Sequence, residues 1–161
     1  MKNDKSKEGK NRIQLTTEQK IKKKIMDLLA RRDHSEKELR QKLREKFEDF
    51  DAIEKAITFV KDRNWLGDPQ KLAEQMANML HRKNKGVRYI QNYLKQKGLP
   101  MPSFNEDLEL EKAKDLINKK FKTNDRSKAT LMKKSRYLQS RGFNNEIISK
   151  IIFTQGDSSE D

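Results

Sequence analysis

The chain has 161 residues, a formal net charge of +13 and no cysteine, and only 32% of its residues are hydrophobic. The lack of cysteine excludes disulfides and thiolate metal sites, and no apolar run approaches the ~18 residues that would span a membrane. The N-terminal residues contain no apolar core of a secretory signal. We therefore expect a soluble cytoplasmic protein whose excess positive charge attracts polyanions, with an affinity that falls as salt rises.

The N-terminal part of the chain predicts an arm followed by two helices. Residues 1–14 are polar and rich in lysine, which indicates a disordered basic arm. The first helix begins at Thr16, which forms the sequence pattern of a capping box with Gln19. A second helix begins at Ser35, where Glu38 stands at the same capping distance. Apolar side chains at helical spacing, isoleucine and leucine in the first helix and leucine and phenylalanine in the second, give both helices an apolar stripe.

A third helix from about residue 51 to residue 64 completes the first predicted unit, residues 15–66. We expect Phe50 to belong to its inner face. His34 is expected at the surface beside the second cap, and Trp65 is expected to pack at the joint with the next unit. Three amphipathic helices with short connections predict a small helical bundle.

The second predicted unit spans residues 67–107. Asp68 is a good N-cap and Pro69 suits the first position of the helix behind it. Gly98 ends the next helix, and the two prolines that follow are incompatible with a helix interior. The third helix of this unit is therefore shortened. What is left of it lies around residues 103–107 or is fused into the next helix.

The third predicted unit spans residues 108–153. Helices are expected from about residue 108 to residue 121 and from about residue 126 to residue 140, and Asn144 can start the last helix. The acids Glu109 and Glu111 look like part of a solvated face. An acidic, frayed tail follows over residues 154–161.

The second helices of the three units repeat one pattern. They align when Leu43, Leu94 and Leu138 are placed in register, at intervals of 51 and 44 residues. Such intervals are typical of helical repeat arrays, in which neighbouring units pack together. The sequence therefore predicts an all-α fold of three tandem three-helix units.

Basic residues are the candidates for function, because the sequence contains no catalytic motif, nucleotide-binding loop or metal-ligand cluster. We predict no enzyme activity, cofactor or metal. A run of one sign costs self-repulsion, which favours a binding role in the second unit over a merely solubilising face. The interleaved tyrosines Tyr89 and Tyr93 are expected at the core edge. The candidate partner-binding residues are Arg31, Arg32, Arg40, Arg82, Lys83, Lys85, Arg88, Lys95, Lys97, Lys133, Lys134, Arg136 and Arg141.

Four stretches carry a family resemblance. They are LLARRDHSEKELRQKL from Leu28, RNWLGD from Arg63, HRKNKGVRYIQNYLKQKGLP from His81, and YLQSRGFNNEIISKII from Tyr137. In order and spacing they resemble RecX, the bacterial regulatory family that acts on the RecA recombinase. The likeness covers about residues 21–153. The first unit departs from the family pattern, since Phe47 follows its basic residue where the family usually has glycine.

The resemblance implies three right-angled three-helix units in an elongated, curved module. It implies a monomer that lies in the groove of the RecA filament on single-stranded DNA, with direct contact to DNA phosphates possible. There it would hinder filament extension, strand exchange and coprotease activity. Two alternatives stay open, a helical regulator that binds DNA or RNA without RecA, and a helical scaffold for another acidic protein.

Overall fold

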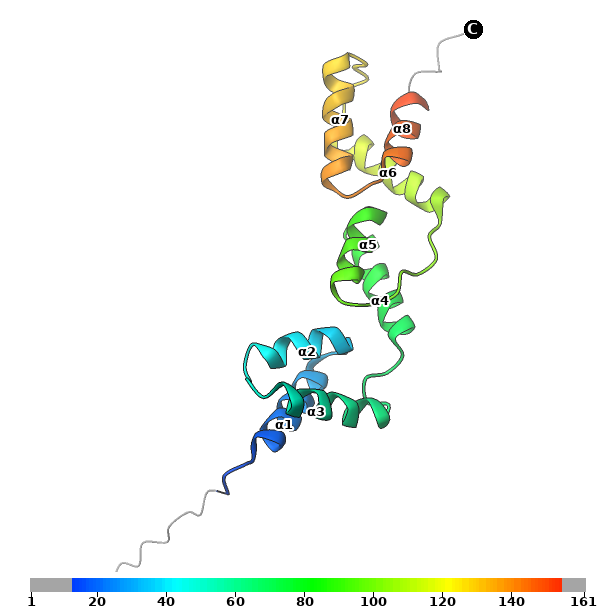
Figure 1. The fold of residues 1–161 in the computed structure, drawn as a ribbon. Coiled ribbons are helices and arrows are strands. Elements are labelled where there is room, and N and C mark those ends of the chain that lie inside the picture. The colour runs from blue at the N-terminus through cyan, green and yellow to red at the C-terminus, as the bar shows by residue number, and fades with distance from the viewer. Residues whose placement is uncertain (1–12, 155–161) are drawn as a thin grey trace, which may run out of the picture.

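The structure, a computed structural model, describes residues 13–154. Most of the predicted arm and nearly all of the predicted tail therefore lie outside the described residues. Between residues 13 and 154 the chain forms eight helices and no strand, which confirms the predicted all-α fold. The helices form three groups that follow one another from end to end of an elongated molecule (Figure 1). None of these helices is long and apolar enough to cross a membrane.

The first group contains α1 (Thr17–Arg31), α2 (Glu36–Arg44) and α3 (Phe50–Asp62). Thr16 and Gln19 form both hydrogen bonds of the predicted capping box. α3 packs against both α1 and α2. The core between them consists of aliphatic side chains, among them Ile21, Ile25, Leu28, Leu39, Leu43, Ile53, Ile57 and Val60.

The second group contains only two helices, α4 (Pro69–Arg82) and α5 (Val87–Gln96). The predicted shortening of its third helix is complete in the structure, because residues 97–105 contain no helix. This segment buries Leu99 in the core of the group and then runs along the molecule to the third group. Prolines lack a backbone donor and disfavour helix in the residue before them, which accounts for the extended course.

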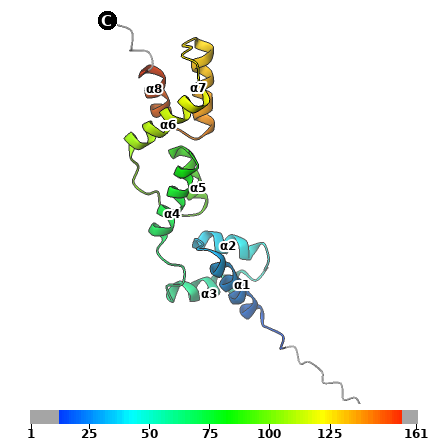
Figure 2. The same cartoon turned by 180° about the vertical axis from the view of Figure 1, so that it is seen from behind.

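The third group contains α6 (Glu106–Lys120), α7 (Lys128–Ser140) and α8 (Asn145–Thr154). The first residues of α6 include the end of the predicted remnant helix, so that part is fused into α6. α8 packs against α6 and α7 over a core of aliphatic residues and Phe143. The separation of the three groups is equally clear from behind (Figure 2).

The second helices of the second and third groups meet end to end. The backbone N–H of Gly86 donates to the carbonyl oxygen of Arg141 (2.8 Å), and that of Arg88 donates to Gly142 (2.9 Å). The first turn of α5 thus gives its free N–H groups to the last carbonyls of α7. We call this contact the α7–α5 joint.

The other end of α5 meets α2 in the same sense. The hydroxyl of Ser35, the N-cap of α2, donates to the carbonyl oxygen of Lys97, the C-cap of α5. We call this contact the α5–α2 joint. The helices α7, α5 and α2 therefore run head to tail, and their dipoles point the same way along the chain of contacts.

Three sequence expectations differ from the structure. His34 is 2% exposed and not at the surface, and its Nδ1–H donates to the carbonyl oxygen of Arg32 (2.9 Å). Phe50 is 56% exposed, because it begins α3 on the side away from the core. Trp65 packs edge to face on Phe59 of its own group, with ring centroids 5.7 Å apart. Each difference depends on neighbours that the local pattern does not contain.

Replacing Gly86 by alanine is expected to separate the second and third groups. A Cβ at Gly86 would lie 2.3 Å from the backbone carbon of Gly142, so the α7–α5 joint has to open. We expect a loss of about 1–3 kcal/mol in the free energy of unfolding, measured with urea, and changed amide signals at Gly142.

The matched control is Gly67→Ala. Gly67 has a positive φ, unlike Gly86, but a Cβ there meets nothing within 4 Å. This variant should lose about 1–2 kcal/mol of unfolding free energy, because alanine disfavours a positive φ, and it should leave the amide signals of Gly142 unchanged. Unchanged Gly142 signals in the Gly86 variant would contradict the joint.

Candidate functional site

The second helices present one face away from their cores. In α2 and α5 the residues opposite Leu43 and Leu94 are exposed, and α7 repeats the arrangement around Leu138. Because the three helices are joined end to end, these faces follow one another along the molecule. We call this set of exposed basic and amide side chains the outer stripe: Lys37, Gln41, Arg44, Arg88, Asn92, Lys95, Arg136 and Gln139.

Three of the predicted binding residues, Arg88, Lys95 and Arg136, lie on the outer stripe. Others are exposed close to helix ends or on neighbouring faces, and these are Arg31, Arg82, Lys83 and Lys133. Two more are partly covered by an aromatic ring: Lys85 Nζ lies 4.6 Å from the ring centroid of Tyr89, and the Arg141 guanidinium lies 5.6 Å from that of Tyr137. Tyr93 packs against the core of its group, as expected.

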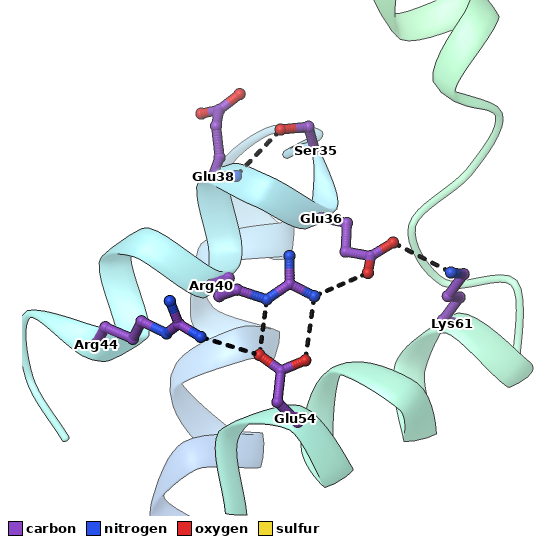
Figure 3. Close-up of polar contacts among 7 residues, drawn as sticks. All are labelled: Ser35, Glu36, Glu38, Arg40, Arg44, Glu54 and Lys61. Atoms are coloured by element: carbon purple, nitrogen blue, oxygen red, sulfur yellow. Dashed lines mark hydrogen bonds and ion pairs between the residues drawn. The ribbon is translucent and has the colours of Figure 1, made fainter. Parts of the chain in front are cut away.

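Arg40 is held by acids of its own group (Figure 3). Its Nε donates to Glu54 at 2.7 Å, and its Nη2 donates to Glu36 at 2.9 Å. These hydrogen bonds raise the pKa of Arg40 and lower the pKa of both carboxyls. The side chain therefore ties α2 to α3. Lys134 is also removed from the surface, since it is only 5% exposed.

Arg32 and Lys97 neutralise a buried carboxylate at the α5–α2 joint. Glu38 is 4% exposed, with Arg32 Nη2 2.6 Å and Lys97 Nζ 3.4 Å from its Oε2. Burial alone would raise the pKa of Glu38, but the hydrogen bond from Arg32 and the charge of Lys97 lower it below the usual value. Ser35 accepts from the backbone N–H of Glu38, as predicted, while the carboxylate pairs with these cations instead of closing a capping box.

The α7–α5 joint contains a second buried carboxylate, which the sequence analysis placed wrongly in a solvated face. Glu109 is 1% exposed and accepts the backbone N–H of Val87 at 2.7 Å. Lys112 Nζ lies 2.8 Å from Glu109 and donates to the carbonyl oxygen of Lys85 at 2.7 Å. The sequence held a signal for this position, because Glu109 precedes the buried residue Ala113 by four positions on the same helix face.

His81 completes this joint as a neutral acceptor. Lys112 Nζ lies 2.8 Å from its Nδ1, so the ammonium donates and the ring accepts. Burial, followed by the charge of Lys112, lowers the pKa of His81. Within residues 13–154 no three His, Cys, Asp or Glu side chains come together in a way that could hold a metal ion. The polar clusters at both joints are therefore explained by packing between groups.

Comparisons with known proteins agree with this architecture. The family models of the first and third three-helix domains of RecX match residues 22–59 and 106–152. The regulatory protein RecX of Vibrio cholerae is 34% identical over 130 residues, which cover 76% of this chain and 85% of that protein. The chain belongs to the RecX family. Members of this family are regulatory proteins and not enzymes.

Further comparisons extend the likeness to sequence from another organism and to a solved structure. The regulatory protein RecX of Haemophilus influenzae is 31% identical over 137 residues, which cover 80% of this chain and 90% of that protein. A crystal structure of regulatory protein RecX superposes with a TM-score of 0.69 at 22% identity, covering 83% of this chain and 70% of that one. The solved structure shows that the fold is shared.

The ion pairs of Glu38 predict a pH-dependent contribution to stability. Because the folded-state pKa of Glu38 lies below its usual value of 4.5, its contribution is present above that pH and is lost as the pH falls through the folded-state pKa. We expect Glu38→Gln to cost about 1–3 kcal/mol of unfolding free energy at neutral pH, measured with urea.

The deficit of the Glu38 variant should shrink when unfolding is measured at acid pH, where the carboxyl of the parent protein is protonated as well. Glu111→Gln is the control, because it makes the same change in charge at an exposed position. A deficit of the Glu38 variant that is the same at all pH values would contradict the role of its charge.

Proposed function

We propose that this chain regulates the RecA recombinase, chiefly as an inhibitor, by lying in the groove of the RecA filament on single-stranded DNA. Membership of the RecX family supports the choice of partner. The carrying observation is the head-to-tail stack, which sets the outer stripe along an elongated molecule (Figure 1). A monomer bound in this way, in the cytoplasm where such filaments form, would hinder filament extension, strand exchange and coprotease activity.

The physical basis of the proposed binding is electrostatic and steric. The cations proposed to bind are those that the structure leaves exposed, above all Arg82, Lys83, Arg88 and Lys95 in the second group. They would meet acidic protein surface and DNA phosphates, with release of counterions. An array as long as three groups would then occupy the space that duplex DNA or a cleavage substrate needs.

A second candidate is direct binding to DNA or RNA without RecA. One observation favours it: amide side chains stand beside the cations of the outer stripe, with Gln41 and Asn92 at equivalent places and Gln139 at the place of Arg44 and Lys95. Asparagine and glutamine can form paired hydrogen bonds with a base edge. Gel shifts with DNA alone and with RecA–DNA filaments discriminate between the two, since only the second candidate requires a complex without RecA.

The proposal predicts inhibition by few molecules. We expect RecA ATPase activity and strand exchange to fall when the protein is added well below the amount of filament protomers, because one bound molecule blocks extension past its site. The measurement is steady-state ATP hydrolysis together with joint-molecule formation. If both rates stay at their values without the protein, the proposed function is wrong.

Reversing the charge of Lys83, Lys85 and Arg88 to glutamate is expected to weaken filament binding by about tenfold or more and to reduce its salt dependence. Circular dichroism should show unchanged helicity. The matched control reverses Lys23, Lys55 and Lys71, which are exposed on α1, α3 and α4 and make the same change in net charge. Equal loss of binding in both variants would exclude a specific role for the second group.

A further inference from the structure

The second group leaves open a face that the first group covers with a helix. In the first group α3 packs over α1 and buries its inner positions. In the register that pairs Leu94 with Leu43, the positions on α4 that match Ile21, Ile25 and Leu28 of α1 are Leu72, Met76 and Met79. No helix follows α5 within its own group, and the extended segment that replaces it takes a different course (Figure 1).

The exposures of the matched residues differ accordingly. Ile25 and Leu28 are buried in the first group, whereas their counterparts Met76 and Met79 are only partly buried. Leu72 is buried like its counterpart Ile21. Together with Tyr93 of α5, the two methionines line a groove of about 500 Å³, and Arg32 and Asp33 of the first group line it as well. Methionines are flexible and polarizable, and they are common in grooves that accept apolar side chains.

Charged side chains lie near the edges of this groove. Lys83 is exposed one turn beyond Met79 on the same side of α4. Lys97 Nζ lies 5.5 Å from the ring centroid of Tyr93, which lines the groove. Arg32 and Lys97 share the carboxylate of Glu38, and Asp33 also lines the groove, so these charges balance and Lys83 supplies the positive charge at the edge.

The chain supplies no segment of its own with the right pattern. Residues 155–161 contain no apolar side chain, and residues 1–12 contain a single one, Met1. An apolar groove of this kind binds a helix through apolar residues at helical spacing, which neither terminal segment has. Neither of these two segments therefore fits the groove.

We propose that this groove binds an amphipathic helix of a partner protein, with an apolar stripe flanked by acidic side chains. The helix would stand in the place that α3 takes in the first group. The 13 residues of α3 set its length, and the exposed charge of Lys83 sets the sign of its flanks. This site is separate from the outer stripe and does not depend on the filament proposal.

The probe is a peptide with the sequence of α3, Phe50–Asp62, carrying Lys55→Glu and Lys61→Glu so that all its charged side chains are acidic. It is added to the full chain with ¹³C-labelled methionine methyl groups. We expect the signals of Met76 and Met79 to shift in a saturable way, while those of Met101 and Met132 stay in place. Met26 on α1 reports whether the peptide displaces α3 in the first group.

Variants test whether the groove itself binds. Met76→Gln with Met79→Gln is expected to weaken peptide binding by about tenfold or more, because both changes remove apolar contact area. The matched control is Met101→Gln with Met132→Gln, at sites that are 37% and 46% exposed. It should bind like the parent chain, and circular dichroism checks that both variants remain helical.

Several results would overturn the proposal. One is the absence of shifts at Met76 and Met79 with the acidic peptide at about 1 mM, the limit of weak binding. Another is equal binding by a peptide of the same composition in scrambled order, or by one with lysine at the acidic positions. A third is a concentration-dependent dimer in sedimentation that itself moves the Met76 and Met79 signals, since the occupant would then be a second copy.

Discussion

The three helical groups of this protein are joined to one another through contacts between helix ends. Every helix leaves backbone donors unpaired at its start and acceptors unpaired at its finish, and burying them without partners is costly. Here both ends of α5 form hydrogen bonds with other groups. The carbonyls of Arg141 and Gly142 accept at its start, and the hydroxyl of Ser35 donates at its end. The close approach needs Gly86 at the first contact. Each joint also encloses one carboxylate with its cations, Glu38 or Glu109.

The functional surfaces follow from this arrangement. Because the second helices touch through their ends, their sides opposite the cores stay free and carry the outer stripe. The other helices, α1 and α3, α4, and α6 and α8, lie to the side of the stack (Figures 1 and 2). A missing third helix therefore opens a groove in the second group without disturbing the line of cations. The two surfaces differ in chemistry, one charged and one apolar with charged edges.

Sequence reasoning succeeded where the information is local. The caps at Thr16, Asp68 and Asn144 and the apolar spacing of each helix depend on residues within one turn, and the structure confirms them. It failed for His34 and Glu109, because both are buried by other segments of the chain. In the sequence Lys97 is one more cation in a basic run. Only the structure shows that it lies across the joint from the buried Glu38 and neutralises it.

The third helices of the first and third groups, α3 and α8, take no part in the hydrogen bonds that the structure describes at the joints. Sequence drift can therefore erode or delete a third helix while the backbone of the array persists. Adding a further module to the array would require matching helix termini together with a buried carboxylate and its cation. The unequal lengths of the three modules fit such a history of copying followed by loss.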